Sequence, residues 1–454
     1  MLDDTIAAIA TAPGEAGLAV VRVSGPGALG VADRVFRGSA SLASAAASTL
    51  HHGWLEGAGE RVDEVVAAVF RAPKSYTRED VVEFSCHGGT MPARAVLALL
   101  LEAGARLARP GEFTLRAFLH GRLDLVQAEA VAELIGARNA RMQRAALARL
   151  GGELSRDLRA QLEAIADALA EVEARVDFAE DVGGVEVPAE LVARVGAIAA
   201  TLRAHLRGAA WGRAMREGVP VAIVGQPNAG KSSLFNRLVG EDRAIVADVP
   251  GTTRDRVSAT IELEGALFTL SDTAGLRDAA DGVEALGIER TEAALAASAV
   301  AVWVLDGSRP FAHEDRAVAA RLAGRRVLVA LNKADRGHEM HAEDVTGALG
   351  PEGDVEVVTT SALTGDGTAE ALAALARVAG FVPGETLGIE RQVHALEGAC
   401  AALERAAAAG VAGAPGEIVA LELRDALTAV EELLGLRVSD DLLERVFSRF
   451  CIGK

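Results

Sequence analysis

The sequence has few cysteines, no long hydrophobic run and a deficit of positive charge. Its three cysteines, Cys86, Cys400 and Cys451, form neither a disulfide framework nor a paired set of zinc ligands, so any thiol chemistry must be individual. No uninterrupted apolar stretch approaches the ~18 residues that a membrane span requires. The first residues, MLDDTIAAIA, are acidic where a secretion signal would be basic. These features predict a cytoplasmic protein with no membrane partner.

The charge balance limits what the chain can bind by itself. Asp and Glu number 64 against 46 Lys and Arg, which gives a formal net charge of −18. This balance argues against a broad nucleic-acid surface, because neutralising phosphates requires clustered Lys and Arg. An RNA substrate would need a local basic patch or a basic partner protein. The 454 residues, 50% of them hydrophobic, suffice for two to four domains with sizeable cores.

The order of hydrophobic patterns predicts an α/β plus all-α architecture. Short β-rich runs such as GLAVVRVSG and DEVVAAVF, with one helical run over residues 94–107, indicate a small α/β domain at the start. Helical composition follows, strands and helices alternate from VPVAIVG onwards, and helical composition returns after GFVPGE. The economical interpretation is a helical domain split in sequence by an inserted, parallel-dominated α/β domain. The predicted ranges are 1–120 for the N-terminal domain, 121–216 and 379–454 for the helical parts, and 217–378 for the insertion.

A phosphate-binding loop is predicted at the start of the inserted domain. GQPNAGKS, residues 225–232, has the required spacing, follows a predicted strand and precedes a helical pattern. Its glycines allow main-chain N–H groups to surround phosphates at a helix N-terminus. Lys231 would reach the β- and γ-phosphates, and the Ser232 hydroxyl can ligate Mg²⁺. A chance glycine turn is the alternative for this motif taken alone.

Three further motifs follow in the order expected of a GTPase. Asp272 ends the strand FTLSD, where it would hold the metal through water, and the Gly275 N–H can meet the γ-phosphate. The Asp335 carboxylate of NKAD can accept from the N1–H and 2-amino groups of guanine, a donor pair that adenine lacks. Ser361 and Ala362, in TSAL, supply a base-side loop after the next strand. The motifs together therefore predict GTP over ATP.

One loop and one substitution concern hydrolysis. The stretch ADVPGTTRD, residues 247–255, contains Thr253, our candidate for the switch threonine that binds Mg²⁺ and senses the γ-phosphate. An ordinary flexible loop is the alternative. Leu276 follows DTAG, where Ras-like enzymes carry the glutamine that orients the attacking water. Hydrolysis therefore needs a substitute for that glutamine.

Stretches spread along the whole chain match one family. They are DTIAAIATAPGEAGLAVVRVSG, YTREDVVEFSCHGG and RPGEFTLRAFLHGRLDLVQAEAVAELI in the first third, then PGTTRD, DTAGLR and the terminal FCIGK. On these stretches the chain resembles the tRNA-modifying GTPases of the MnmE (TrmE) family over nearly its full length. The resemblance implies a folate-binding N-terminal domain that dimerises, a helical domain, and a Ras-like GTPase domain inserted in the latter.

The resemblance also implies a reaction and a partner. The protein would act with the FAD-dependent partner MnmG on the wobble uridine of certain tRNAs, where it would install an aminomethyl or carboxymethylaminomethyl group at C5. The acidic balance fits this division of labour, since the partner can supply much of the tRNA-binding surface. The folate would be a 5-formyl- or 5,10-methylene-tetrahydrofolate.

Arg22, Glu83 and Arg122 match folate-contacting positions of the family. The residue types suit a folate, because its glutamyl carboxylates attract Arg or Lys and the pterin N–H edge suits a carboxylate acceptor. Arg122 stands where relatives often have lysine, so the charge is kept while the hydrogen-bond geometry can differ. Surface ion pairing is the alternative for each of them taken alone.

The chain end has two interpretations. In the family the tail approaches the folate site, which makes Lys454 a folate contact and Cys451 a candidate participant in one-carbon chemistry. Alternatively, Cys451 packs at a helix end, as free cysteines usually do. A prenylation box is rejected for CIGK, because Gly453 is not aliphatic and Lys454 is not an accepted final residue.

Family position also suggests how hydrolysis proceeds without the glutamine. Glu284 would position the water, and Asn228 would bind a K⁺ ion whose remaining ligands are main-chain carbonyls when two GTPase domains meet. The carbonyls are those of Ala247, Val249 and Thr252. Glu284 can instead be an ordinary acid at a helix start and Asn228 a turn former. Arg254, Arg256 and Arg277 are the alternative sources of positive charge.

The complete prediction for the GTP site follows the motifs. Glu284, Thr253 and, for the folate chemistry, Cys451 are the predicted catalytic residues. The predicted GTP contacts are Asn228, Ala229, Gly230, Lys231, Ser232, Ser233, Ala247, Asp248, Val249, Pro250, Gly251, Thr252, Thr253, Asp272, Thr273, Ala274, Gly275, Asn332, Lys333, Asp335, Ser361 and Ala362.

Two other functions use some of the same features. A GTP-dependent switch in RNA or ribosome assembly would use the nucleotide motifs, but it has no need of the folate residues or the cysteine tail. A folate-dependent aminomethyltransferase acting on protein would leave the GTPase unexplained. We therefore expect a tRNA-modifying enzyme subunit that uses GTP and folate.

Overall fold

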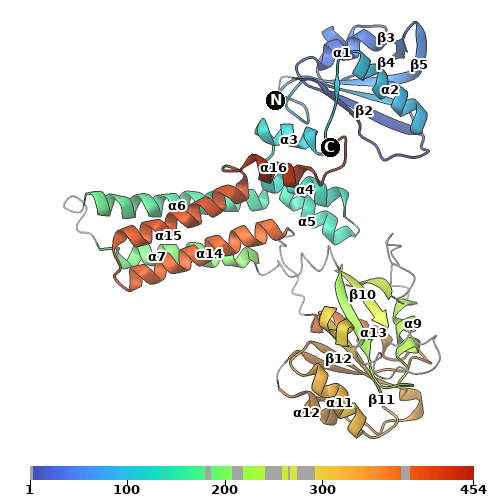
Figure 1. The fold of residues 1–454 in the computed structure, drawn as a ribbon, viewed down its shortest axis with the longest axis vertical. Helices are drawn as coiled ribbons and strands as arrows, with labels where there is room; N and C mark the ends of the chain where they lie inside the picture. The colour runs from blue at the N-terminus through green and yellow to red at the C-terminus, as the bar shows by residue number, and fades with distance from the viewer. Residues whose placement is uncertain are drawn as a thin grey trace. The chain divides into compact units, whose positions relative to one another are not determined.

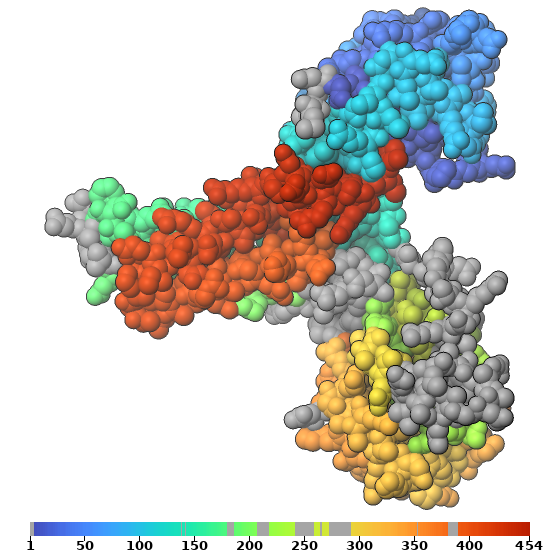
Figure 2. Space-filling view, in the orientation of Figure 1, coloured from blue at the N-terminus to red at the C-terminus, as the bar shows by residue number. Residues whose placement is uncertain are grey.

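The computed structural model contains two compact units, one of which is interrupted in sequence by the other (Figures 1 and 2). The first unit comprises Met1–Arg138, Met142–Leu202 and Ala395–Lys454, and the second comprises Asn139–Arg141 and Arg203–His394. This arrangement confirms the predicted insertion of an α/β domain into a helical domain, while the individual domain boundaries stay predictions. The residues described are 4–137, 139–178, 186–206, 218–240, 258–263, 266–272, 292–351, 353–379 and 389–454.

The N-terminal part of the first unit is a mixed sheet of seven strands in the order β3-β4-β5-β6-β2-β1-β7. Every pair is antiparallel except β1 with β7. The strands are β1 (Ile6–Ile9), β2 (Leu18–Ser24), β3 (Phe36–Gly38), β4 (Thr49–Gly57), β5 (Glu60–Phe70), β6 (Val81–His87) and β7 (Arg106–Leu107). The helices are α1 (Ala28–Val35), η1 (Leu42–Ser44), α2 (Thr90–Glu102) and α3 (Glu112–Leu119).

Alternation along β2 and β6 positions the predicted folate residues. Val21 and Phe84 are buried in the core with α1 and α2, so their neighbours Arg22 and Glu83 point to the opposite face of the sheet. The predicted helix over 94–107 was too long: α2 ends at Glu102, and Arg106–Leu107 form β7. Gly104, at φ +109°, allows the chain to turn between them.

The rest of the first unit is helical. Its helices are α4 (Leu125–Ile135), α5 (Ala140–Leu150), α6 (Glu153–Asp177), α7 (Ala189–Leu206), α14 (Glu390–Val411), α15 (Gly416–Leu434) and α16 (Asp440–Phe447). Figure 1 shows α6, α7, α14 and α15 as a bundle, which ion pairs link: Arg424 with Glu173 joins α15 to α6, and Arg405 with Glu422 joins α14 to α15. Helices α6 and α15, which come from the two sequence segments, therefore lie against each other.

Helix α16 brings the chain end towards the N-terminal part. Phe447 and Phe450 are buried with Leu125, Ala128 and Val131 of α4. The last residues, red in Figure 2, lie against the N-terminal part of the same unit. Consequently, residues from both ends of the sequence meet there.

The second unit has a six-stranded sheet in the order β13-β12-β11-β8-β10-β9. All pairs are parallel except β9 with β10. Its strands are β8 (Val219–Val224), β9 (Ser258–Leu263), β10 (Ala266–Asp272), β11 (Val300–Asp306), β12 (Val327–Asn332) and β13 (Val355–Thr359). Its helices are α9 (Lys231–Val239), α11 (His313–Leu322), η2 (Ala334–Arg336), α12 (Ala342–Leu349) and α13 (Thr368–Val378).

Burial in this sheet follows the sequence pattern. The continuous apolar runs of β11 and β12 are buried along nearly their whole length, as central parallel strands covered on both faces require. The carboxyl ends of parallel strands lie at one edge of such a sheet, where ligands bind in open α/β folds. That edge carries the predicted nucleotide motifs. Among the described residues, none of the helices has the length and apolar character needed to cross a membrane.

Candidate functional site

The loop between β8 and α9 has the backbone geometry of a phosphate site. Gly225 has φ +148°, and a Cβ there would lie 2.2 Å from the Val304 carbonyl oxygen, so the close approach to β11 requires glycine. Gly230 has φ +97° at the N-cap of α9, and Asn228, at φ +62°, is a non-glycine residue in the left-handed region. The loop therefore leads into a helix N-terminus, where main-chain N–H groups and the helix dipole favour an anion.

Lys231 is the cation of this loop. Its side chain is folded over the loop, where Nζ donates to the carbonyl oxygens of Gly225 at 3.0 Å and Gln226 at 2.9 Å. Ser232 and Ser233 follow in the first turn of α9. The lysine thus already lies over the loop that would receive phosphates, and a hydroxyl suited to Mg²⁺ follows it in sequence.

Asn332 connects the phosphate side to the base side. Its side chain is buried, donates from Nδ2 to the Ala229 carbonyl oxygen at 2.9 Å, and accepts at Oδ1 from the Ala362 N–H at 2.9 Å. A buried amide with its groups paired in this way is a fixed structural link. The phosphate loop and the loop after β13 are therefore joined through one residue of NKAD.

The other polar residues of NKAD are also ordered by hydrogen bonds. Ser361 Oγ donates to Asp335 Oδ1 at 2.6 Å, which orients the carboxylate predicted to bind guanine. Lys333 Nζ lies 2.6 Å from Asp306 Oδ2 at the end of β11. Burial opposes ionisation of Asp306, but hydrogen bonds from Lys333 and Ser308 outweigh it and hold the Asp306 pKa below its ordinary value.

Several predicted residues of the GTP site lie outside the described residues. They are Ala247, Asp248, Val249, Pro250, Gly251, Thr252, Thr253, Thr273, Ala274, Gly275 and Glu284. Asp272 is the last residue of β10, as predicted from FTLSD. The structure therefore brings together the phosphate and base motifs, and it does not test the switch threonine, the K⁺ carbonyls or the water-positioning acid.

The predicted folate residues gather on the first unit. Arg22 and Glu83 are directly paired across β2 and β6, with Arg22 Nε 2.7 Å from Glu83 Oε1. Arg122 Nη1 donates to the Tyr76 carbonyl oxygen at 2.8 Å. Burial, followed by the nearby Arg22 charge, lowers the pKa of Lys454, while Glu83 acts in the opposite direction. Three cationic side chains and one carboxylate, far apart in sequence, therefore form one polar cluster.

Tyr76, which the sequence analysis missed, lies between two of these residues. The Cζ atoms of Arg22 and Arg122 are 5.2 and 4.8 Å from the centre of its ring, and its hydroxyl is 2.9 Å from Thr114 Oγ1. Cation–π contacts of this kind hold guanidinium groups in place. Tyr76 is the one tyrosine of the chain and begins the stretch YTREDVVEF. Its place at the start of this stretch was the sequence signal by which Tyr76 could have been identified.

The C-terminal tail completes the cluster. The Gly111 N–H donates to the Cys451 carbonyl oxygen at 3.4 Å, and Arg22 Nη1 donates to the Gly453 carbonyl oxygen at 3.3 Å. Gly453 has φ +96°, and a Cβ there would lie 2.3 Å from the Ile9 carbonyl oxygen. Cys451 is exposed next to this contact. The tail therefore fits against β1 and β2 only because residue 453 has no side chain.

Cys86 and a cavity of the second unit contribute no predicted residue to these sites. Cys86 is buried, and burial raises its pKa to about 11, so its thiol is unreactive near neutral pH. No group of three or more candidate metal ligands occurs among the described residues.

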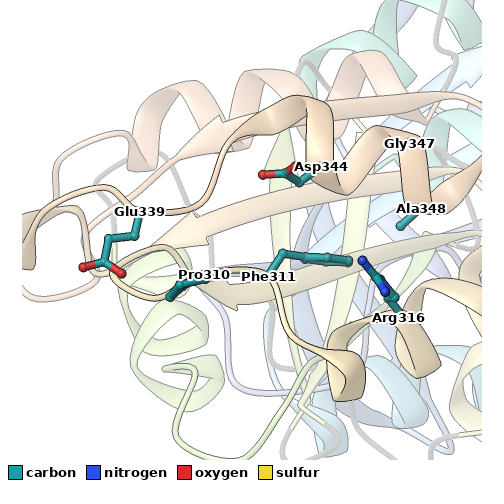
Figure 3. A pocket seen from close by; sticks show the side chains of 7 residues that line it. All are labelled: Pro310, Phe311, Arg316, Glu339, Asp344, Gly347 and Ala348. Carbon is teal, nitrogen blue, oxygen red and sulfur yellow. The ribbon is translucent and has the colours of Figure 1, made fainter.

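A cavity of about 390 Å³ lies in the second unit between α11, α12 and the segment after β11 (Figure 3). Its lining residues are Pro310, Phe311, Arg316, Glu339, Asp344, Gly347 and Ala348, none of them a predicted site residue.

Two family models match the chain. The model described as the GTP-binding protein TrmE N-terminus matches residues 5–122, and the model described as the MnmE helical domain matches residues 125–451. The first match contains Arg22, Glu83, Tyr76 and Arg122. The second extends across the inserted unit to the cysteine of the tail.

Curated relatives match over their full length. Proteins named tRNA modification GTPase MnmE from Symbiobacterium thermophilum, Koribacter versatilis and Moorella thermoacetica are 44%, 41% and 42% identical to this chain. Each match covers 100% of this chain and 100% of the relative. Among solved structures, the G domain of the T. maritima FeoB iron transporter is 23% identical, with 36% of this chain and 98% of that chain covered and a TM-score of 0.27. At that score the structural match adds nothing to the sequence relatives.

Proposed function

The chain belongs to the MnmE family of tRNA modification GTPases, and we propose that it hydrolyses GTP in the cytoplasm as part of a complex that modifies the wobble uridine of tRNA. The group added at C5 is aminomethyl or carboxymethylaminomethyl. The observation that carries this proposal is the C-terminal tail, whose Gly453 carbonyl accepts from Arg22 beside Glu83. A nucleotide switch without modification chemistry has no use for this second polar site.

The residues of the second unit suit GTP with Mg²⁺. Residues 228–233 would hold the phosphates, and Asn332, Lys333, Asp335, Ser361 and Ala362 the base. Ser232 and Thr253 would ligate Mg²⁺, which supplies charge neutralisation at the phosphates when bound. The fit of the described part rests on the glycine-dependent loop, the overlying Lys231 and the ordered Asp335 carboxylate.

Leu276 stands where Ras-like enzymes carry the glutamine that orients the attacking water. Hydrolysis therefore requires another residue in that role. We assign water positioning to Glu284 and K⁺ binding to Asn228, with the carbonyls of the 247–252 stretch as further ligands. Asn228 lies in the phosphate loop with a left-handed backbone conformation. Its side-chain amide oxygen is the type of ligand that hard cations prefer. K⁺ would supply positive charge next to the phosphates where negative charge develops.

The polar cluster of the first unit suits a tetrahydrofolate derivative. Arg22, Arg122 and Lys454 offer cations for glutamyl carboxylates, and Glu83 offers an acceptor for pterin donors. Such a cofactor supplies a one-carbon unit when bound. Cys451, exposed on the docked tail, is assigned to the chemistry at this site. FAD belongs to the partner MnmG, which also supplies much of the tRNA-binding surface.

A homodimer is proposed to form through the N-terminal domain. Leu50, Ala68, Glu83 and Arg22 are consecutive partners across β4, β5, β6 and β2, so they share one face of the sheet. Leu18, Leu50 and Val66 are exposed apolar residues on these strands. A second copy that covers them would lie next to the Arg22–Glu83 pair.

Mass spectrometry of wobble-uridine nucleosides tests the function. Cells that lack the protein should lose the C5-modified nucleosides, and expression of the wild-type chain should restore them. A chain with Lys231→Ala should fail to restore them, because it lacks the phosphate-binding cation. Normal modified nucleosides in the deletion strain would favour the alternative, an RNA or ribosome assembly switch.

A further inference from the structure

Arg237 connects the helix of the phosphate loop to the base-side loop. It lies in the last turn of α9, the helix that Lys231 begins. Its Nη2 donates to the Leu363 carbonyl oxygen at 2.8 Å, and its Nε donates to the Ala362 carbonyl oxygen at 3.4 Å. One guanidinium therefore binds two consecutive main-chain carbonyls of the loop after β13.

The loop becomes exposed at the point where Arg237 binds it, since Ser361 is buried, Ala362 is half-buried and Leu363 is exposed. Leu363 is 76% exposed, so burial of its side chain does not hold the loop. Gly365, at φ +92°, lies against the guanidinium, and a Cβ there would be 3.6 Å from Arg237 Cζ. Hydrogen bonds from Arg237 to the two carbonyls, and from the Ala362 N–H to Asn332, join this part of the loop to α9 and β12. Within the loop, the Thr364 and Gly365 N–H groups also donate to Ser361.

The same loop orders the base-reading carboxylate. Ser361 donates to Asp335, so a shift of the loop would also move or release Asp335. At the other end of α9 are Lys231 and the helix N-terminus that faces the phosphates. Because α9 is a rigid element, Arg237 relates the position of the base-side loop to that of the phosphate loop.

We propose that Arg237 is a positioning residue for guanine-nucleotide binding, which acts by fixing the Ser361–Leu363 loop at the distance from the phosphate loop that a guanine nucleotide spans. This proposal rests on the proposed GTP site. It assigns no contact between Arg237 and the nucleotide.

Dissociation of a fluorescent GDP analogue from the full chain measures this role. Arg237→Ala should raise the dissociation rate ~10-fold or more, since two hydrogen bonds from a charged donor are lost. The KM for GTP should rise, while kcat at saturating GTP stays within about twofold, because the hydrolytic groups are untouched. The melting temperature of the nucleotide-free protein should fall by no more than a few degrees, because the lost hydrogen bonds hold one exposed loop, and the variant should stay folded at the assay temperature.

Two further variants make the result specific. Arg237→Lys should bind more weakly than wild type, because one ammonium on a flexible stem does not reproduce the two-point donation of a guanidinium. Arg321→Ala, on α11, is the matched control, since the Arg321 side chain is exposed and has no hydrogen bond to the described residues. It should leave GDP dissociation unchanged.

Three outcomes would overturn the proposal: unchanged GDP dissociation in Arg237→Ala, wild-type behaviour of Arg237→Lys, or a fall in nucleotide-free melting temperature that accounts for the weaker binding. Failure of the wild-type chain to bind GDP would instead overturn the GTP site itself. The wild-type measurement therefore separates the two hypotheses.

Discussion

Replacing Gly453 by alanine should separate the tail from the proposed folate site without removing any charged group. At φ +96° a side chain costs ~1–2 kcal/mol of backbone strain. The added Cβ would also lie 2.3 Å from the Ile9 carbonyl oxygen, a main-chain atom in β1 that cannot easily move. The tail must therefore leave its place, and the hydrogen bond from Arg22 to the Gly453 carbonyl is lost with it.

The cost to folate binding follows from Lys454. This residue is partly buried near Arg22 and Glu83, and it would move away with the displaced tail. One hydrogen bond to a charged group is worth ~1.5–3 kcal/mol. We therefore expect Gly453→Ala to weaken binding of 5-formyltetrahydrofolate by roughly 10- to 100-fold.

Isothermal titration calorimetry with 5-formyltetrahydrofolate provides the measurement. Gly413→Ala is the control, because Gly413 also has a positive φ, +67°, yet a Cβ there meets no described atom within 4 Å. It should lower stability slightly and leave folate affinity unchanged. Glu83→Ala should weaken binding strongly and serves as the reference for a direct contact. Wild-type affinity in Gly453→Ala would show that the docked tail is not part of the folate site.

Four further predictions concern single residues. Asp335→Asn should shift preference from guanine towards xanthine, since the amide can donate to the carbonyl at purine C2; competition binding that still favours guanine would mean that Asp335 does not read the base. Cys451→Ser should sharply reduce tRNA modification with nearly intact GTP hydrolysis, and normal wobble nucleosides would return the cysteine to a structural role. Glu284→Ala should slow hydrolysis by roughly 10²-fold or more with GTP binding retained, and wild-type kcat should be higher in K⁺ than in Na⁺; stopped-flow phosphate release at equal rates in the two salts would reject the cation. Hydrogen bonding to Arg106 outweighs the opposing effect of burial and lowers the Asp4 pKa from 3.8 to about 2, so the stabilising contribution of Asp4 is present above about pH 4 and is lost as the pH falls towards 2. The difference in unfolding free energy between wild type and Asp4→Asn should therefore narrow as the pH falls from about 4 to about 2, and a constant difference would contradict this assignment.

Much of the second unit could be predicted from the sequence because its signals are local. The phosphate loop is continuous over residues 225–232, so its spacing can be recognised locally, although its glycines are also required by close contacts with the distant Val304 and Asn332. NKAD begins at the end of β12, an apolar strand that is buried along its length, and TSAL follows β13, a mostly half-buried strand at the edge of the sheet. In a parallel sheet such strands end at one edge, so the order of the motifs was enough to predict a common site.

The end of α2 shows where local pattern was insufficient. The run to Leu107 has helical periodicity, but the backbone turns at Gly104, and Arg106 of β7 pairs with Ile6 of β1. Pairing with a distant strand satisfies the backbone groups as a helix would, and it outweighs local propensity. The hydrophobic pattern of residues 94–107 does not show that its end will pair with β1.

Only the tertiary structure decided which residues form the first polar cluster. Arg22 meets Glu83 through the register of β2 and β6, Tyr76 lies between Arg22 and Arg122, and Lys454 arrives through the packing of α16 on α4. The sequence alone determined the residue types and, by family resemblance, suggested the roles that we propose for them. Their contacts depend on sheet register and helix packing between segments from opposite ends of the chain, and those are set by burial of the whole core rather than by neighbouring residues.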